Sequence, residues 1–192
     1  MLPAAGLYPA DQPRPTESRA EITVFEALRA GGLPRGWFGW HALRIRDPGG
    51  YHAEGDFIFA VPGRGLLALE CKGGRIQHQG GRWTQNGKPL AKAPLEQALG
   101  IALAIRDRLA ERGIALPAFG HLVCFADTPS CEEAPHDELR GAALGARDLR
   151  YLSEALRAKA ERLLPAPQGD PALPAEELWI GALHEIWAET WI

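Results

Sequence analysis

The chain has 192 residues, of which 46% are hydrophobic, and its formal net charge is −3. This length and apolar content suit one domain with its own core, and the weakly acidic balance excludes binding of polyanions through overall charge. The three cysteines show no CxxC spacing, which argues against a zinc site, and their odd number fits a reduced, cytoplasmic protein. We expect no signal peptide and no membrane span, because no stretch has the required basic and long apolar regions.

The first half of the chain predicts a helix followed by strands. Residues 1–16, rich in Pro and Ala, predict an extended arm. N-cap residues at 16–18 then precede a helix over 19–30, which Gly31-Gly32 ends. Strands are expected over 36–45 and on both sides of a turn at 62–65, and the glycine-rich stretch 73–90 predicts a twisted hairpin.

The second half predicts helices around one buried strand. Pro94 begins the clearest helix, in which apolar residues recur at helical spacing up to Gly113. Residues 120–127 predict a buried strand, 128–146 a loop, and 148–164 a further helix. A linker leads to a C-terminal amphipathic helix with three tryptophans, Trp179, Trp187 and Trp191. This order of elements indicates an α/β fold with a mixed sheet.

Charged residues stand at the ends of two apolar strands in GDFIFAVPGRGLLALECKGG, residues 55–74. On the second strand Glu70 and Lys72 share one face, and Cys71 points the other way as a small core residue. Asp56, on the first strand, meets Glu70 only if paired residue numbers sum to an even value. A symmetric four-residue turn at 62–65 gives the sum 127 and would place Asp56 beside Cys71. A loop with an odd number of residues, or a bulge at one of its glycines, is therefore a condition for any site here.

With an even register, two carboxylates lie close together at one end of an apolar hairpin. Asp56 and Glu70 do not both ionise readily there without a cation, and a hard divalent cation prefers carboxylate oxygens. Lys72 would lie beside that metal, where it can orient water or stabilise an anionic transition state. This set suits attack of water on a phosphodiester. The alternative is an ion pair between Lys72 and one of the acids within the fold.

Six short pieces of sequence, in order, resemble the NERD (nuclease-related) domain of the PD-(D/E)XK nuclease superfamily. They are AEITVFEAL on the first helix, LPRGW, EGDF, ECKGG, GRW and PLEQA, and they span about residues 17–127. The resemblance implies a restriction-endonuclease-like α/β core, with a central mixed β-sheet flanked by helices and a helical C-terminal extension. We therefore expect an arm over 1–16, the nuclease-like domain over 17–164, and a linker with the C-terminal helix over 165–192.

The resemblance also implies roles for individual residues. Asp56 and Glu70 would be metal ligands, and Lys72 the catalytic lysine of a nuclease that uses Mg²⁺ or Mn²⁺. Glu21 would approach the metal directly or through water, and Gln97 would lie near the site or a phosphate. Without the resemblance, Glu21 is a helix-surface acid and Gln97 a polar residue at a helix N-terminus.

Two further acids compete for places in the site. Glu54 shares a strand face with Asp56, and is either an additional acid or a solvated residue at the start of the strand. Glu26 is the rival of Glu21 on the first helix, but five residues separate the two and place them on different faces.

A basic run follows the strand that carries Glu70-Cys71-Lys72, called here the ExK strand. Between Lys72 and Leu95 there is no acid and the local charge is +5, which makes this the expected place for a phosphate backbone. The candidate DNA contacts are Arg75, Arg82, Lys88 and Lys92. The alternative is a solvated hairpin.

Three functions remain open from the sequence. The first is a metal-dependent nuclease that cleaves DNA in processing, repair or defence against foreign DNA. The second is a catalytically weak module that binds nucleic acid or docks a helicase or another partner, since the NERD domains that this chain resembles are often fused to such modules. The third is a member of the fold whose acid cluster is structural. The tryptophan-rich C-terminal helix would pack in the core, or form an interface with a partner or in a homodimer.

Overall fold

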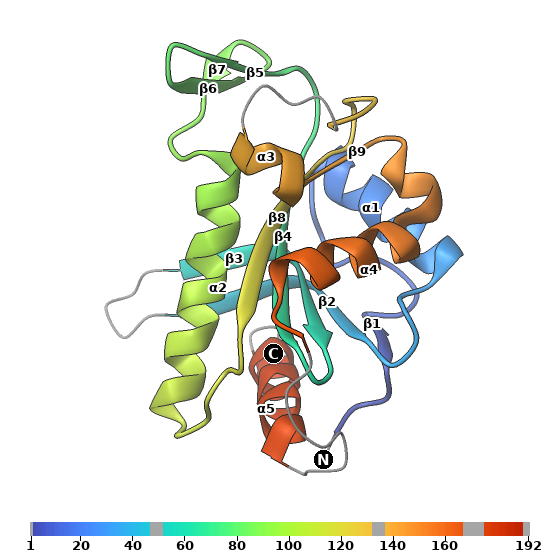
Figure 1. Cartoon of the computed structure of the whole chain (residues 1–192), viewed down its shortest axis with the longest axis vertical. Coiled ribbons are helices and arrows are strands. Elements are labelled where there is room, and N and C mark those ends of the chain that lie inside the picture. Colours follow the sequence, from blue (N-terminus) through green and yellow to red (C-terminus); the bar gives the residue numbers. More distant parts are fainter. Residues whose placement is uncertain (1, 47–51, 132–136, 167–174, 190–192) are drawn as a thin grey trace.

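The computed structural model describes residues 2–46, 52–131, 137–166 and 175–189. At its centre lies a mixed six-stranded sheet with helices on both faces (Figure 1). In spatial order, the strands are β1 (Gly6–Tyr8), β2 (Phe38–Arg46), β3 (His52–Val61), β4 (Gly65–Lys72), β8 (Phe119–Phe125) and β9 (Ala143–Gly145). Strand β3 pairs antiparallel with both β2 and β4, whereas β1 is parallel to β2, β8 to β4 and β9 to β8. The α/β fold with a mixed sheet is confirmed.

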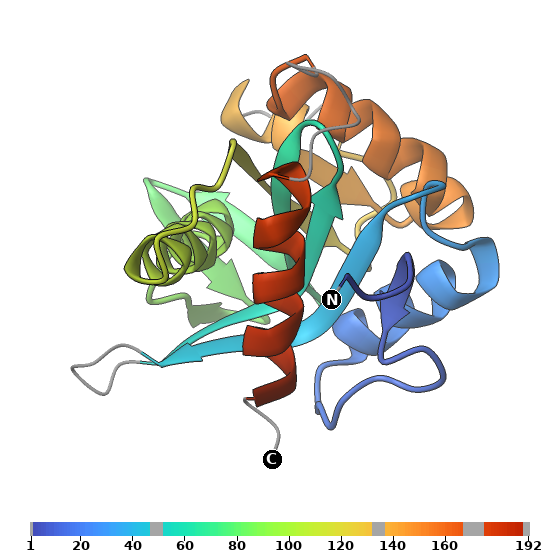
Figure 2. The ribbon, with the colours of Figure 1, turned by 90° about the horizontal axis from the view of Figure 1, so that it is seen from below.

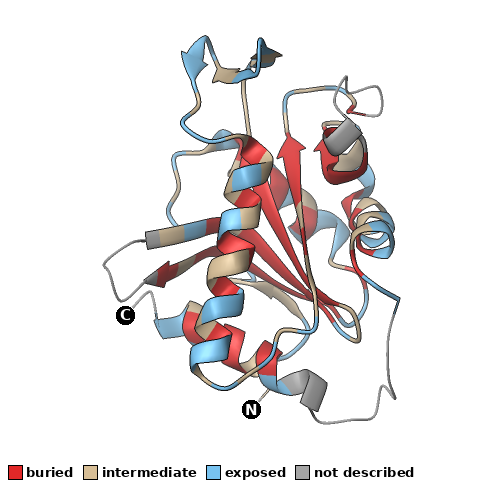
Figure 3. Ribbon diagram, turned by 60° about the vertical axis from the view of Figure 1, so that its left-hand side comes forward, coloured by how far each residue is buried: buried red, intermediate tan, exposed pale blue. Residues whose placement is uncertain are grey.

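Two helical layers cover the sheet. Helices α1 (Arg19–Gly31) and α4 (Leu152–Leu163) pack on one face, through residues such as Phe25 and Leu156. Helices α2 (Pro94–Glu111) and α5 (Ala175–Glu189) pack on the other, through Ile105 and Trp179 (Figure 2). Because both faces are covered, the central strands are buried almost throughout (Figure 3).

Local sequence explains where helices α1 and α2 begin and end. The Ser18 side chain caps α1 by accepting the Glu21 N–H, and Gly32, with φ +76°, ends it. Pro94 opens α2, and Gly113, with φ +71°, follows its end.

Shorter elements lie around the main sheet. Strands β5 (Ile76–Gln79), β6 (Arg82–Gln85) and β7 (Lys88–Pro89) form a separate three-stranded sheet, the wing, beyond the N-terminal end of α2 (Figure 1). A 3₁₀ helix, η1 (Asp148–Tyr151), precedes α4. The segment expected to be a loop, 128–146, holds helix α3 (Asp137–Ala142) and strand β9.

The two ends of the chain are built into the fold. Within the segment expected to be an extended arm, strand β1 adds an edge to the sheet beside β2. Trp179, on α5, is 2% exposed, and Trp187 packs partly buried against the same core. Core packing of these two tryptophans is therefore confirmed, and Trp191 lies outside the described residues.

The register of the β3–β4 hairpin meets the condition set by the sequence. Phe57 pairs with Leu69 and Val61 with Gly65, so paired numbers sum to 126 and the loop has three residues, 62–64. Gly65 makes the tight return possible: its φ is +140°, and a Cβ there would collide with the Ala118 carbonyl.

Strands β3 and β4 separate at the end of this hairpin. Their pairing stops at Phe57 with Leu69, whereas β3 continues beside β2. At Ala42, whose φ is +53°, β2 also switches faces: Trp40 and Leu43, an odd number of residues apart, pack into the same core. The site lies at this split in the sheet.

Candidate active site

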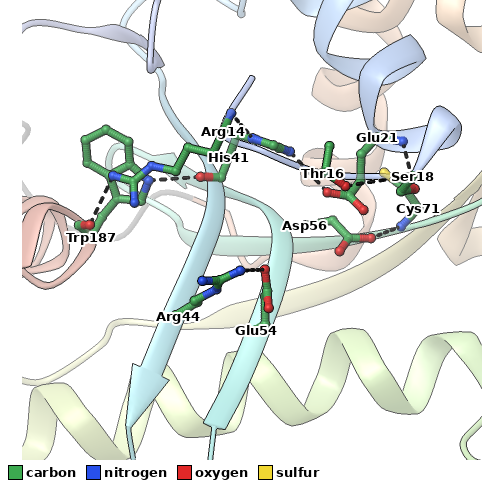
Figure 4. Close-up of polar contacts among 10 residues, drawn as sticks. All are labelled: Arg14, Thr16, Ser18, Glu21, His41, Arg44, Glu54, Asp56, Cys71 and Trp187. Carbon is green, nitrogen blue, oxygen red and sulfur yellow. Dashed lines mark hydrogen bonds and ion pairs between the residues drawn. The ribbon is translucent and has the colours of Figure 1, made fainter. Parts of the chain in front are cut away.

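Asp56 and Glu70 stand on either side of the split between β3 and β4. The Asp56 Oδ2 accepts a 2.7 Å hydrogen bond from the Cys71 N–H, in the position where a backbone carbonyl of β3 would continue the ladder (Figure 4). Glu70, the residue before Cys71 on β4, is 6% exposed. The even register thus brings the two carboxylates together, and Cys71 faces the opposite core.

Lys72 joins the acid pair and is held from helix α2. Its Nζ lies 2.6 Å from Glu70 Oε1 and 3.0 Å from Gln97 Oε1. The Gln97 amide nitrogen donates a 3.0 Å hydrogen bond to the Lys92 carbonyl, which fixes the orientation of the amide. Lys72 and Gln97 thus lie together beside Glu70.

Glu21 reaches the same place from the first turn of α1. A glutamate at this position usually binds back to the N-cap amide, but the Thr16 hydroxyl accepts the Ser18 N–H at 3.0 Å instead. The Glu21 carboxylate, 13% exposed, turns toward His41, whose Nε2 lies 3.2 Å from its Oε2 (Figure 4). Glu26, its rival, is exposed on α1.

Two pockets meet at these acids. One, of about 920 Å³, lies on the α2 side, and its lining includes Lys92 and Gln97. The other, of about 630 Å³, lies on the side of the α1 N-terminus and includes Lys72. The acids that line both pockets are Glu21, Asp56 and Glu70. They are accessible from two directions.

Burial and mutual repulsion set the protonation of the acids. Burial, together with the charges of Glu70 and Glu21, raises the pKa of Asp56 well above its ordinary value. Burial also raises the pKa of Glu70, although Lys72 opposes the shift. Burial alone would raise the pKa of Glu21, but hydrogen bonds with His41, Ser18 and Thr16 outweigh it and lower the value. If all three acids were ionised, the site would hold more negative charge than the Lys72 ammonium balances, and the raised pKa values of Asp56 and Glu70 reflect this in part.

Comparison with known proteins agrees with this arrangement. The family model of the nuclease-related domain, NERD, matches residues 16–126. The chain belongs to the NERD family. Neither a curated protein nor a solved structure matches it. Family membership supports a nuclease-related function in general and a nuclease-like core, and all five residues of the acid, lysine and glutamine set lie inside the matched range.

A divalent metal fits the donors of this NERD domain in part. Among the described residues, no group of three or more His, Cys, Asp or Glu side chains is arranged to hold an ion. Mg²⁺, however, commonly binds through one or two carboxylates and keeps several waters or phosphate oxygens. Asp56 and Glu70 offer such a pair, and both line the two pockets.

The other charged residues that the sequence marked as candidates lie on or beside the wing, or line the larger pocket. Arg75, Arg82 and Lys88 are exposed on or beside the wing, and Lys92 is exposed at the rim of the larger pocket. Glu54 lines that pocket too, but Arg44 binds it in an exposed ion pair of 3.1 Å. In the parts of the chain that the structure describes, no helix is long and apolar enough to cross a membrane.

One part of this NERD site has no signal in the sequence. His41 contacts Glu21, and the Arg14 N–H contacts His41, yet Arg14 lies outside the family match. Residues so far apart in the chain leave no local spacing to detect, and a lone histidine in an apolar strand is ordinarily a core residue.

Proposed function

We propose that this protein is a divalent-metal-dependent nuclease that hydrolyses phosphodiester bonds in DNA. The observation that supports it best is the buried pair Asp56 and Glu70, with the Lys72 ammonium 2.6 Å from Glu70. The setting we propose is DNA processing, repair or defence against foreign DNA in the cytoplasm.

Each residue of the set has a distinct role in this proposal. Asp56 and Glu70 would hold Mg²⁺ or Mn²⁺, and Glu21 would bind the ion directly or through water. When bound, such an ion polarises a phosphoryl oxygen and lowers the pKa of bound water. Lys72 would place its positive charge against the scissile phosphate as negative charge builds up, and Gln97 would keep the ammonium in position.

The basic residues would bind the rest of the substrate. Lys92 lines the larger pocket beside the acids, so it would contact a phosphate close to the reacting one. Arg75, Arg82 and Lys88 are exposed farther out and would neutralise phosphates of the flanking DNA.

A cleavage assay with titrated Mg²⁺ and Mn²⁺ tests this function. We expect metal-dependent cleavage that falls about 100-fold or more in Glu70→Ala and in Lys72→Ala, because each removes charge stabilisation at the reacting phosphate. Arg157→Ala, on the exposed surface of α4, serves as the control. Absence of cleavage by well-folded wild-type protein with either metal would contradict the proposal.

A second candidate function is a catalytically weak module that binds nucleic acid or docks a helicase or other partner. In its favour, Glu70 and Gln97 already engage the Lys72 ammonium, as they would in a structural ion pair. It predicts DNA binding that needs no metal and survives Asp56→Ala. A homodimer through the C-terminal helix has less support, because Trp179 is buried within the chain's own core.

A further inference from the structure

His41 is a buried imidazole at the edge of the candidate site, and the roles assigned above leave it unused. Its side chain is 0% exposed, on β2, and its ring lies between Phe25 and Phe57, with centroid distances of 5.6 Å and 4.9 Å. A polar ring inside an apolar layer needs partners for its nitrogens, because an unpaired buried polar group is costly.

Hydrogen bonding decides which nitrogen of His41 carries the proton. The Nδ1 lies 3.0 Å from the backbone N–H of Arg14, which can only donate, so Nδ1 accepts. The proton of the neutral ring is therefore on Nε2, which points at Glu21 Oε2 from 3.2 Å. His41 thus presents a single N–H to a single carboxylate oxygen.

The Glu21 carboxylate is free to accept this hydrogen bond because α1 does not need it to cap the N-terminal amide of Ser18. The Thr16 hydroxyl has taken the Ser18 amide that an N3 glutamate normally binds. Without that obligation, the orientation of the Glu21 carboxylate depends on His41 and on the hydroxyls of Ser18 and Thr16.

We propose that His41 is a positioning residue, which holds the Glu21 carboxylate toward Asp56 and Glu70 by donating from Nε2. This rests on the proposed function, because it treats Glu21 as the third acid around a divalent ion. Outer partners of this kind typically change metal affinity by about 10-fold to 100-fold when they are removed.

The two ends of the chain hold His41 in turn. The Trp187 indole N–H of α5 donates to the His41 carbonyl at 2.9 Å. The Arg14 guanidinium lies 3.7 Å over the Trp187 ring and donates to the Trp187 carbonyl at 3.2 Å (Figure 4). Both residues lie outside the range 16–126 that the family model matches, so segments flanking the NERD domain hold a residue within it. The Arg14 N–H sets the tautomer of the ring, and the Trp187 N–H holds the backbone.

Two substitutions at His41 separate positioning from packing. In His41→Gln the side-chain amide nitrogen replaces Nε2 and still donates to Glu21. In His41→Asn the side chain can still accept the Arg14 N–H but falls short of Glu21. His121→Asn, in β8, is the control for loss of a partly buried strand histidine.

The measurement is Mn²⁺ affinity of the full chain by calorimetry, with urea unfolding to establish that each variant is folded. We expect His41→Gln and His121→Asn to bind within about threefold of wild type, and His41→Asn about 10-fold to 100-fold more weakly. Nitrogen-15 NMR of the metal-free protein should show the His41 proton on Nε2.

Three results would overturn the proposal while leaving the nuclease assignment intact. They are wild-type Mn²⁺ affinity in His41→Asn, equal losses in folded His41→Asn and His41→Gln, and an Nδ1 proton in the NMR spectrum. Failure of the wild-type protein to bind Mn²⁺ would instead remove the proposed function, and this inference with it.

Discussion

Gln97 accepts a hydrogen bond from Lys72 at 3.0 Å and thereby links helix α2 to the ExK strand. An ammonium only donates and the Lys92 carbonyl only accepts, so the amide of Gln97 has a single orientation that satisfies both. Gln97 thus holds the Lys72 ammonium beside Glu70.

Gln97→Leu, which keeps the shape and removes both hydrogen bonds, should reduce kcat for DNA cleavage by about 10-fold to 100-fold. The reason is that a displaced catalytic group loses orientation while substrate contacts remain. Steady-state kinetics with saturating Mn²⁺ would measure this, with Gln12→Leu on the exposed N-terminal segment as the control. An unchanged kcat would show that Lys72 needs no help from α2.

Asp56→Asn should stabilise the protein increasingly as pH rises. Burial, followed by the charges of Glu70 and Glu21, raises the folded-state pKa of Asp56 well above its ordinary value of 3.8. At pH values between 3.8 and the folded-state pKa, native Asp56 therefore holds a proton that the unfolded chain has lost. Wild-type stability therefore falls as pH rises through that window, and the substitution abolishes this loss. Asparagine can still accept the Cys71 N–H, so the ladder contact is kept.

Urea unfolding at several pH values would measure this difference, with Asp107→Asn, 63% exposed on α2, as the matched control. Mg²⁺ should stabilise the wild-type protein near pH 8 and have little effect on Asp56→Asn. A difference between variant and wild type that does not grow with pH would contradict the account of the acid pair.

Gly65→Ala should destabilise the fold by roughly 2 kcal/mol or more, because the new Cβ would meet the Ala118 carbonyl in a backbone conformation with φ +140°. Gly100→Ala, on α2 with open space around it, should instead stabilise by about 0.5–1 kcal/mol. Thermal and urea unfolding would distinguish the two. Equal stability of both variants would mean that the short loop is not what holds the register.

The double variant Arg82→Glu/Lys88→Glu should weaken DNA binding and flatten its salt dependence. Each lost phosphate contact lowers the slope of log affinity against log salt by about 0.9 for duplex DNA, so two contacts predict a change of about 2. Fluorescence anisotropy at several salt concentrations would measure it. The matched control is Arg150→Glu/Arg157→Glu, with both residues exposed on η1 and α4. Equal effects of both pairs would assign the binding to net charge rather than to the wing.

Much of the fold follows from local patterns in the sequence. The apolar periodicity of α2 and the residues at its ends predict it closely. The alternation of side chains along a strand also shows that the β3–β4 hairpin needs an even register if Asp56 is to meet Glu70. Whether the loop has three or four residues depends on the approach of Gly65 to Ala118, more than 50 residues away in the chain, so local sequence does not decide it. Local patterns do not predict short elements such as β9, because such a strand forms only by pairing with a neighbouring strand.

The acid, lysine and glutamine set could be proposed from the sequence because it falls within short motifs. Its geometry could not, since the face switch at Ala42 and the end of pairing at Phe57 are properties of three strands together. His41 and Arg14 act through contacts between distant segments, and no spacing announces such contacts.

The hydrogen bond from Cys71 to Asp56 has a consequence for how this sheet tolerates being open. A strand that loses its neighbour ordinarily leaves an amide without an acceptor, and burying such an amide is costly. Here the Asp56 carboxylate accepts the Cys71 N–H in place of the lost carbonyl. One hydrogen bond therefore both satisfies the amide at the split between the strands and holds an acid of the candidate site. The architecture of the sheet and the chemistry of the site therefore share one residue, and only a substitution that keeps the oxygen while removing its charge can tell them apart.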